Sequence, residues 1–200
     1  MPAVTNEIAR ARLAVLIGSQ GRGSNMANLI RAGREGRMAA DVSLVISPKA
    51  DTPAVDVARE LGLEPVILPY KAENYAGQLL AQLQEHNVDL ICLAGYMTLF
   101  PVSVLAMFPQ RVLNIHPALL PKFGGKGMYG MHVHQAVVAA GESESGATVH
   151  YVTEHYVEGA IIDQERCTVE PGDTPETLAA RVLACEHRLY PRAVNQVLGA

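Results

Sequence analysis

Short apolar runs recur along the first half of the chain, with room for a helix between most of them. The runs are LAVLIG, DVSLVIS, EPVIL, VDLICLAG and VLNIH, at residues 13–18, 41–47, 64–68, 88–95 and 112–116. Helix-period patterns fill the first three gaps, at residues 25–34, 52–61 and 74–86. Continuous apolar runs joined by helices are typical of parallel strands that are covered on both faces. We therefore predict an α/β fold with a doubly wound, mostly parallel central sheet.

The pattern changes after residue 116. Residues 147–152 and 159–169 alternate between apolar and polar positions, which is typical of longer antiparallel strands, and residues 153–158 would join them. A final helix should begin with Asp173 or Thr174 as N-cap and Pro175 in its first turn. These features predict a mixed-strand C-terminal extension. With 49% apolar residues, a chain of 200 residues can bury one sizeable core, so we expect a single domain over residues 1–200.

Charge and hydropathy limit the classes of partner. The formal net charge of −4 argues against a broad nucleic-acid surface, which needs clustered positive charge. No apolar run approaches the roughly 18 residues of a membrane span, and the N-terminal segment lacks the order of a signal peptide. Cys92, Cys167 and Cys185 lie far apart and follow no metal-ligand spacing. We expect a cytoplasmic protein with small-molecule partners, no nucleic acid and no membrane, as a monomer or homodimer.

A glycine-containing loop, IGSQGRGSNMANLI at residues 17–30, follows the first strand and opens the first helix. Glycines let the backbone turn tightly and approach a ligand, and helix N-termini attract anions. The amides near Gly23, Ser24 and Asn25 would face a phosphate. The loop is neither a P-loop nor a dinucleotide motif, because no Gly-Lys-Ser/Thr follows and Met26 replaces the third glycine. Monophosphate binding and a purely structural tight turn both remain open on this pattern.

Asn114 and His116 lie two residues apart at the carboxyl end of the fifth predicted strand. Residues two apart on a strand point the same way, and ligands bind beyond the carboxyl ends of strands in doubly wound sheets. Pro117 and Pro121 would hold this corner rigid. An amide donor beside an imidazole suits a carbonyl whose oxygen becomes negative under nucleophilic attack. The alternative is a buried Asn and His that satisfy loop carbonyls.

Three motifs carry a resemblance to a known family. NIHPALLPKF, GRGSN and LAGYM, at residues 114–123, 21–25 and 93–97, resemble the folate-dependent formyltransferases, most closely those that act on phosphoribosylglycinamide in purine biosynthesis. The match runs from Leu13 to Leu198. The resemblance implies a Rossmann-like formyltransferase fold and the transfer of a formyl group from 10-formyltetrahydrofolate to the amine of 5-phosphoribosylglycinamide. The implied reaction requires no metal.

The resemblance also implies catalytic roles. Asn114 would bind the formyl oxygen, and His116, as imidazolium, would stabilise the oxyanion and give a proton to the leaving nitrogen. His150 would support this corner. The family carries an aspartate in the loop after the VHYV strand, and an ungapped match puts Val157 at that position. Without a carboxylate nearby, His116 should be largely neutral near pH 7.

The binding residues implied by the resemblance come from four segments. Gly23, Ser24 and Asn25 would hold the ribotide phosphate, with Pro117 and Glu186 on the rest of that substrate. Folate would contact Met97, Thr98, Leu99, Phe100, Asn114, Val152, Glu154 and Glu158. Residues 13–116 would thus be the phosphate-binding α/β half, and residues 117–200 would supply the catalytic loop, the folate-binding part and the C-terminal helix. A lid role for the loop at residues 123–134 stays open.

The match of Val157 to the position of the family aspartate has three alternative explanations. The chain is an inactivated form that still binds its ligands, or Glu158 turns inward after a one-residue shift, or Glu154 reaches the site. We expect weakened or abolished catalysis with binding largely intact. A non-catalytic folate- and ribotide-binding protein and a sugar-nucleotide N-formyltransferase are the competing functions. His132 and His134 are interpreted as loop or helix-start residues and not as metal ligands.

Overall fold

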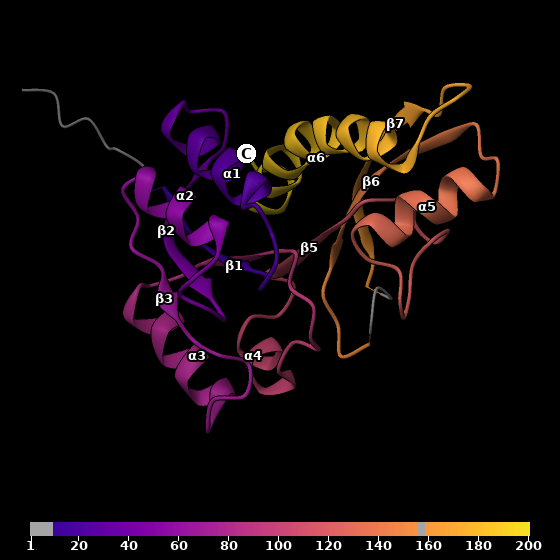
Figure 1. The fold of residues 1–200 in the computed structure, drawn as a ribbon. Coiled ribbons are helices and arrows are strands. Elements are labelled where there is room, and N and C mark those ends of the chain that lie inside the picture. Colours follow the sequence, from indigo (N-terminus) through magenta and orange to yellow (C-terminus); the bar gives the residue numbers. More distant parts are fainter. Residues whose placement is uncertain (1–9, 156–158) are drawn as a thin grey trace, which may run out of the picture.

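A seven-stranded sheet runs through the computed structural model, which describes residues 10–155 and 159–200 (Figure 1). The strands are β1 (Ala11–Ile17), β2 (Ala40–Ser47), β3 (Val66–Ile67), β4 (Leu90–Ala94), β5 (Val112–His116), β6 (Glu144–Tyr151) and β7 (Ile161–Thr168). Their order is β3-β2-β1-β4-β5-β6-β7. The first five strands pair in parallel, whereas β6 is antiparallel to both β5 and β7. The predicted mostly parallel α/β sheet with a mixed-strand extension is confirmed.

Six helices accompany the sheet within the described part of the chain. They are α1 (Ser24–Arg34), α2 (Pro53–Glu60), α3 (Tyr75–Glu85), α4 (Val102–Met107), α5 (Met131–Ala139) and α6 (Pro175–Leu198). Thr174 caps α6 by accepting a hydrogen bond from the Thr177 amide, and Pro175 occupies the first turn, as predicted. The sequence did not predict α4, and it placed α5 partly in a loop. None of the helices described is long and apolar enough to cross a bilayer.

Successive residues of β1 pack into different cores. Leu13, Val15 and Ile17 belong to a core that includes residues of α1, α2, α5 and α6, whereas Ala14 and Leu16 belong to one that includes residues of α3 and α4. Strand residues alternate between faces, so these two cores are the two sides of one sheet. Because both faces are covered, the ends of the strands are where this sheet can meet a ligand.

The carboxyl ends of β1, β4 and β5 lie at one edge of the sheet. Ile17 pairs with Ala94, and Leu93 pairs with Asn114, so the segments that follow these strands start side by side. Gly18 makes this approach possible, because a Cβ atom there would lie 1.9 Å from the carbonyl oxygen of Gly95. The parallel register therefore brings the glycine-containing loop, the segment after β4 and the Asn114 corner together.

Helix α6 ties this edge to the C-terminal part of the chain. Tyr190 is fully buried, and its hydroxyl lies 2.9 Å from the carbonyl oxygen of Leu93 and 3.2 Å from that of Leu113. The two carbonyls belong to β4 and β5, one residue before Ala94 and Asn114. Glu186 lies one helical turn before Tyr190, so the Tyr190 contacts also fix its height against the sheet.

Candidate active site

Asn114 and His150 face each other across the antiparallel pair of β5 and β6. The Asn114 Nδ2 atom lies 3.1 Å from His150 Nε2, and His150 Nδ1 lies 2.9 Å from the carbonyl oxygen of Tyr151. A carbonyl only accepts, so the His150 proton is on Nδ1, and Nε2 accepts from the Asn114 amide. This contact orients the amide nitrogen of Asn114 and leaves its second N–H as a donor for a ligand.

His116 is buried at the end of β5 and contacts the loop that follows. Its Nε2 atom lies 2.8 Å from the carbonyl oxygen of Phe123. Phe123 has a φ of 56°, in the left-handed region that side-chain-bearing residues rarely adopt. One alternative from the sequence was a buried histidine that satisfies a loop carbonyl, and His116 makes such a contact. This contact involves the Nε2 atom of the His116 ring and does not involve Nδ1, the second nitrogen that can bind or release a proton.

Burial favours the neutral form of three histidines around this corner. The pKa of His116 is lowered by burial, and the Phe123 carbonyl opposes that shift more weakly. Burial likewise lowers the pKa of His134 and His150, and a charge on His116 lowers each further. Among the residues described, no carboxylate contributes to the His116 shift. The direction agrees with the expectation that His116 is largely neutral near pH 7.

The glycine-containing loop reaches α1 at Gly23, whose φ is 76°. Ala27 makes the first helical hydrogen bond, from its amide to the Gly23 carbonyl at 2.8 Å. The N–H groups of Ser24 and Asn25 precede that bond, and so they are not used by the helix itself. These are the amides that the sequence assigned to a phosphate, and they lie at the positive end of the α1 dipole.

Asn25 and Glu186 are 161 residues apart in the chain and in direct contact. Asn25 Nδ2 donates to Glu186 Oε2 at 2.7 Å, which joins the start of α1 to α6. Glu186 is 8% exposed, and burial raises the pKa of its carboxyl, partly offset by the Asn25 hydrogen bond. The Oδ1 atom of Asn25 is buried with no partner among the described residues. The structure thus brings together two residues that the sequence assigned to the same substrate.

The segment after β4 exposes two apolar side chains, Met97 and Leu99, with the half-buried Thr98 between them. Phe100 instead packs inward against the Tyr96 ring, with 5.8 Å between the ring centroids, which leaves its backbone for the predicted folate contact. Val152, on the neighbouring segment, donates its amide to the Val112 carbonyl at 2.8 Å. Apolar side chains with a few polar groups nearby are typical of small-molecule sites.

Glu154, one of the carboxylates considered for the His116 site, lies at the surface. Its side chain is 62% exposed, and its Oε1 atom lies 3.7 Å from His155 Nε2. Val157 and Glu158 lie outside the described residues, and the predictions that concern them stay untested. Pro117 follows β5 directly and is half-buried beside the corner.

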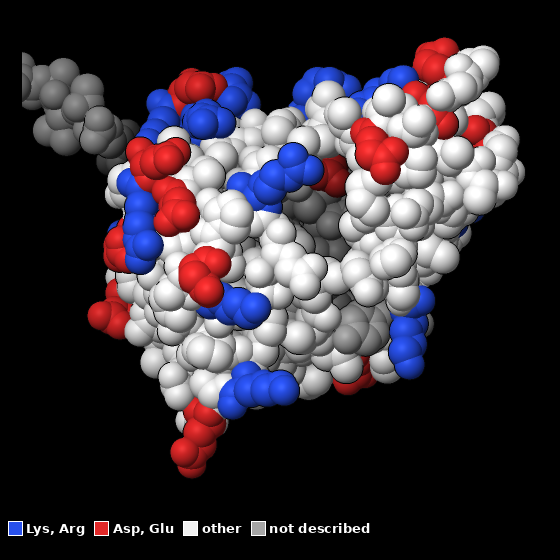
Figure 2. All heavy atoms as spheres, viewed as in Figure 1, with Lys and Arg blue, Asp and Glu red and all other residues white. Residues whose placement is uncertain are grey.

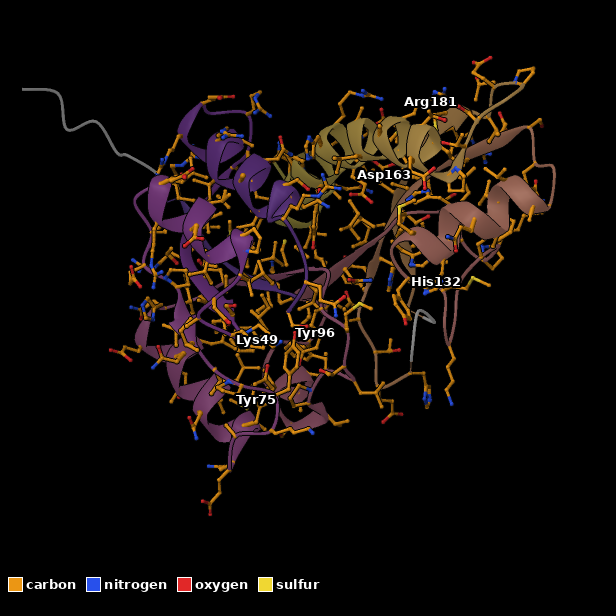
Figure 3. The ribbon with its side chains drawn as sticks, in the orientation of Figure 1. Lys49, Tyr75, Tyr96, His132, Asp163 and Arg181 are labelled. Atoms are coloured by element: carbon orange, nitrogen blue, oxygen red, sulfur yellow. The ribbon has the colours of Figure 1, made fainter. Side chains whose placement is uncertain are left out.

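A tyrosine cluster at the same edge was not anticipated. The Tyr75 and Tyr96 hydroxyls are 3.2 Å apart (Figure 3). The Tyr70 ring lies edge-on to both of these rings, at centroid distances of 6.0 and 5.1 Å. The Tyr70 hydroxyl donates to the Ile17 carbonyl at 3.4 Å. The cluster thus ties α3 and the ends of β1 and β4 together. The sequence did not predict the burial of His134 in the first turn of α5 either. Its pattern indicated only that His134 lies in a loop or at the start of a helix.

The elements that carry these residues surround a hollow. Figure 2 shows that this face of the molecule is hollowed where Figure 1 places the space between α1, α5 and α6. Uncharged atoms form most of its visible wall, with basic and acidic side chains at its upper edge. Asn25 lies on α1, Glu186 on α6 and His134 on α5. A small polar substrate would find an amide, a carboxyl and histidines on the surrounding elements.

Known proteins resemble this chain in sequence and in fold. Residues 11–194 match the formyl transferase family. The chloroplastic phosphoribosylglycinamide formyltransferase of Arabidopsis thaliana is 41% identical over 198 residues, which cover 96% of this chain and 67% of that protein. The phosphoribosylglycinamide formyltransferase of Brucella melitensis has a solved structure with a TM-score of 0.85 and 41% identity, covering 96% of this chain and 97% of that one. Glycinamide ribonucleotide transformylase 1 of Symbiobacterium toebii superposes with a TM-score of 0.85 at 39% identity, covering 95% and 89%.

Proposed function

This chain belongs to the formyl transferase family, and from that premise we propose that it transfers the formyl group of 10-formyltetrahydrofolate to the amine of 5-phosphoribosylglycinamide, a step of purine biosynthesis. The names of relatives near 40% identity support this donor and acceptor. The observation that carries the proposal is the contact of the Asn114 amide with His150 at the end of β5. His116 lies two residues after Asn114 on the same strand. This corner offers a donor for an oxyanion beside a group that can move a proton.

The proposed chemistry assigns one task to each side chain of the corner. The substrate amine attacks the formyl carbon, and the formyl oxygen takes up the electron pair. The second N–H of Asn114 donates to that oxygen, while His150 keeps the amide in the orientation that allows it. His116 accepts the proton that the amine loses and donates it to the leaving nitrogen. No metal enters these steps.

The substrate positions follow the same edge of the sheet. The amides of Gly23, Ser24 and Asn25 would bind the phosphate, and Glu186 and Pro117 would hold the rest of the ribotide. The folate would lie along residues 97–100, with Val152, Glu154 and Glu158 from the loop after β6. Residues 13–116 then supply the phosphate half of one domain, and residues 117–200 supply the rest. A cytoplasmic location stays a prediction from the sequence.

Formyl transfer with both purified substrates is the direct test of this function. We expect slow turnover by the parent chain and a rise in kcat of about tenfold or more in Val157→Asp, because a carboxylate near His116 would stabilise the imidazolium that forms while His116 carries the proton. Val157→Asn is the matched control, since it has the shape of aspartate without the charge, and it should not raise kcat.

Two outcomes would count against the proposal. If both ligands bind and neither the parent nor Val157→Asp turns over, the chain is a binding protein on this scaffold. If a sugar-nucleotide amine is formylated and 5-phosphoribosylglycinamide is not, the acceptor is wrong. Calorimetric titration of each ligand accompanies the assay, so that loss of binding is separated from loss of chemistry.

A further inference from the structure

We propose that the backbone carbonyl of Phe123 is a positioning group for this reaction: it keeps the proton of neutral His116 on Nε2 and so makes Nδ1 the atom that exchanges protons with the substrates. The inference rests on the proposed function and adds to it the atom that carries the proton. Nothing in the formyl-transfer assignment itself requires this tautomer.

The hydrogen bond fixes the tautomer. The Phe123 carbonyl oxygen lies 2.8 Å from His116 Nε2 and has no hydrogen to give. Nε2 must therefore carry the proton, and in a neutral imidazole the lone pair is then on Nδ1. A second-layer partner that fixes the protonated nitrogen of a histidine also fixes the orientation of its ring.

The carbonyl is held in place by contacts of the corner that carries it. The Leu120 amide donates to Thr148 Oγ1 at 3.1 Å, and Gln164 Nε2 donates to the Leu120 carbonyl at 3.0 Å. Lys122 Nζ lies 2.9 and 3.0 Å from the two carboxylate oxygens of Glu142. The Phe123 side chain packs against the core on the α5 and α6 side. An unusual φ persists when its surroundings determine it in this way.

The proton then follows a balanced path. As the new C–N bond forms, the amine proton passes to Nδ1 of His116, and the carbonyl electrons move to the formyl oxygen. The imidazolium is held by its Nε2–H bond to Phe123. As the oxygen electrons return, the bond from carbon to N10 breaks, and the proton on Nδ1 passes to N10. His116 starts and ends neutral, so this path does not depend on a resident imidazolium.

The surroundings of His116 favour this starting state. His134 on α5 and His150 on β6 are the titratable groups in the described residues that interact electrostatically with it. Burial lowers the pKa of all three rings, so each is neutral around pH 7. A carbonyl partner supports a transient imidazolium less strongly than a carboxylate would.

The test compares two substitutions at residue 123 in the full chain. Phe123→Leu keeps an unbranched Cβ and can keep the left-handed φ, whereas the β-branched side chain of Phe123→Ile opposes it and turns the carbonyl away. Both replace the ring by an aliphatic group of the same size. The imidazole nitrogens are read by 15N NMR, with the His116 signals assigned by their loss in His116→Asn.

We expect the Nε2–H tautomer of His116 in the parent and in Phe123→Leu, and a mixture of tautomers in Phe123→Ile. The kcat of Phe123→Ile should fall about tenfold or more below that of Phe123→Leu, with a similar KM for the ribotide and a similar thermal transition. The kcat/KM of the parent should rise with pH as His116 loses its proton. A proton on Nδ1 in the parent, equal behaviour of the two variants, or a kcat/KM that falls over that titration would overturn the inference.

The same measurements separate this inference from the proposed function. An Nδ1–H tautomer in a chain that transfers formyl groups rejects only the role of Phe123. A well-formed Nε2–H tautomer in a chain that turns over neither alone nor as Val157→Asp rejects formyl transfer, and with it the proton path.

Discussion

At the scale of single residues, the contact of Asn114 with His150 decides the orientation of the Asn114 amide. The amide has a nitrogen and an oxygen of nearly the same size, and only the lone pair on His150 Nε2 distinguishes them. The Tyr151 carbonyl determines where that lone pair lies, because it accepts a hydrogen bond from Nδ1–H and so keeps the His150 proton on Nδ1. The orientation of the Asn114 amide is therefore set by a neighbouring side chain and a backbone atom.

We predict that His150→Leu lowers kcat on the order of 100-fold, because the Asn114 amide loses the acceptor that orients it. His150→Gln is the control, since its side-chain oxygen can accept the same bond, and it should retain most of the rate. Steady-state kinetics on both variants, with circular dichroism to check folding, provides the measurement. Equal losses in the two variants would show that the orientation of Asn114 is not the cause.

At the scale of elements, the start of α1 is shaped by one glycine. Gly23 has a φ of 76°, and a Cβ there would lie 3.0 Å from the Cα and Cβ atoms of Ala54 on α2. We predict that Gly23→Ala destabilises the fold by about 1–3 kcal/mol and raises the KM for the ribotide, because the strain moves the amides that would hold its phosphate.

Gly21→Ala is the matched control for that prediction. Gly21 lies in the same loop, and the nearest atom to an added Cβ is 3.9 Å away. Urea unfolding and ribotide titrations should show little change in this variant. If Gly21→Ala and Gly23→Ala weaken ribotide binding equally, the effect belongs to loop flexibility and not to the geometry at the α1 N-terminus.

The elements differ in how well the sequence predicted them, and their burial, length and composition explain the difference. Strands β1 and β4 are apolar at most positions because both of their faces are covered, and β5 is apolar except at Asn114 and His116, so all three stand out in the sequence. Helix α4 has six residues, too few for a 3.6-residue period to show. The first residues of α5 follow a run of glycines and mix two histidines with apolar residues, so its start resembled a loop.

At the scale of the whole molecule, the buried histidines make stability depend on pH. Burial lowers the pKa of His116, His134, His150 and His187 from the ordinary value of about 6.5. Between each lowered pKa and about 6.5 the unfolded chain binds more protons than the folded one. The free energy of unfolding should therefore fall as pH falls below about 6.5.

Glu186 acts in the opposite direction, because its raised pKa makes the folded chain bind more protons than the unfolded one above the ordinary carboxyl range. We therefore predict that Glu186→Gln steepens the loss of stability on acidification and that His134→Asn reduces it. The exposed His132, two residues from His134, serves as control through His132→Asn. Urea unfolding at pH 7.5, 6.5 and 5.5 measures all four chains, and a parent whose stability is constant over this range would contradict the prediction.

The sequence by itself determined the class of fold and the position of the reactive corner. Apolar runs with helices between them specify a parallel sheet whichever residues lie at its ends, and residues two apart on a strand share a face by geometry alone. Asn114 and His116 could thus be placed at the end of β5 from local rules. The family resemblance then named the reaction, which the comparisons support.

Only the tertiary structure decided which groups touch. The bond from Asn25 to Glu186 and that from Asn114 to His150 join elements far apart in the chain, so no local pattern contains them. The bond from His116 to Phe123 spans only seven residues, yet Phe123 has a left-handed φ, and side chains of β6 and β7 hold the same loop through Leu120. Protonation follows from burial and from such contacts, and both are properties of the packed molecule and not of the order of its residues.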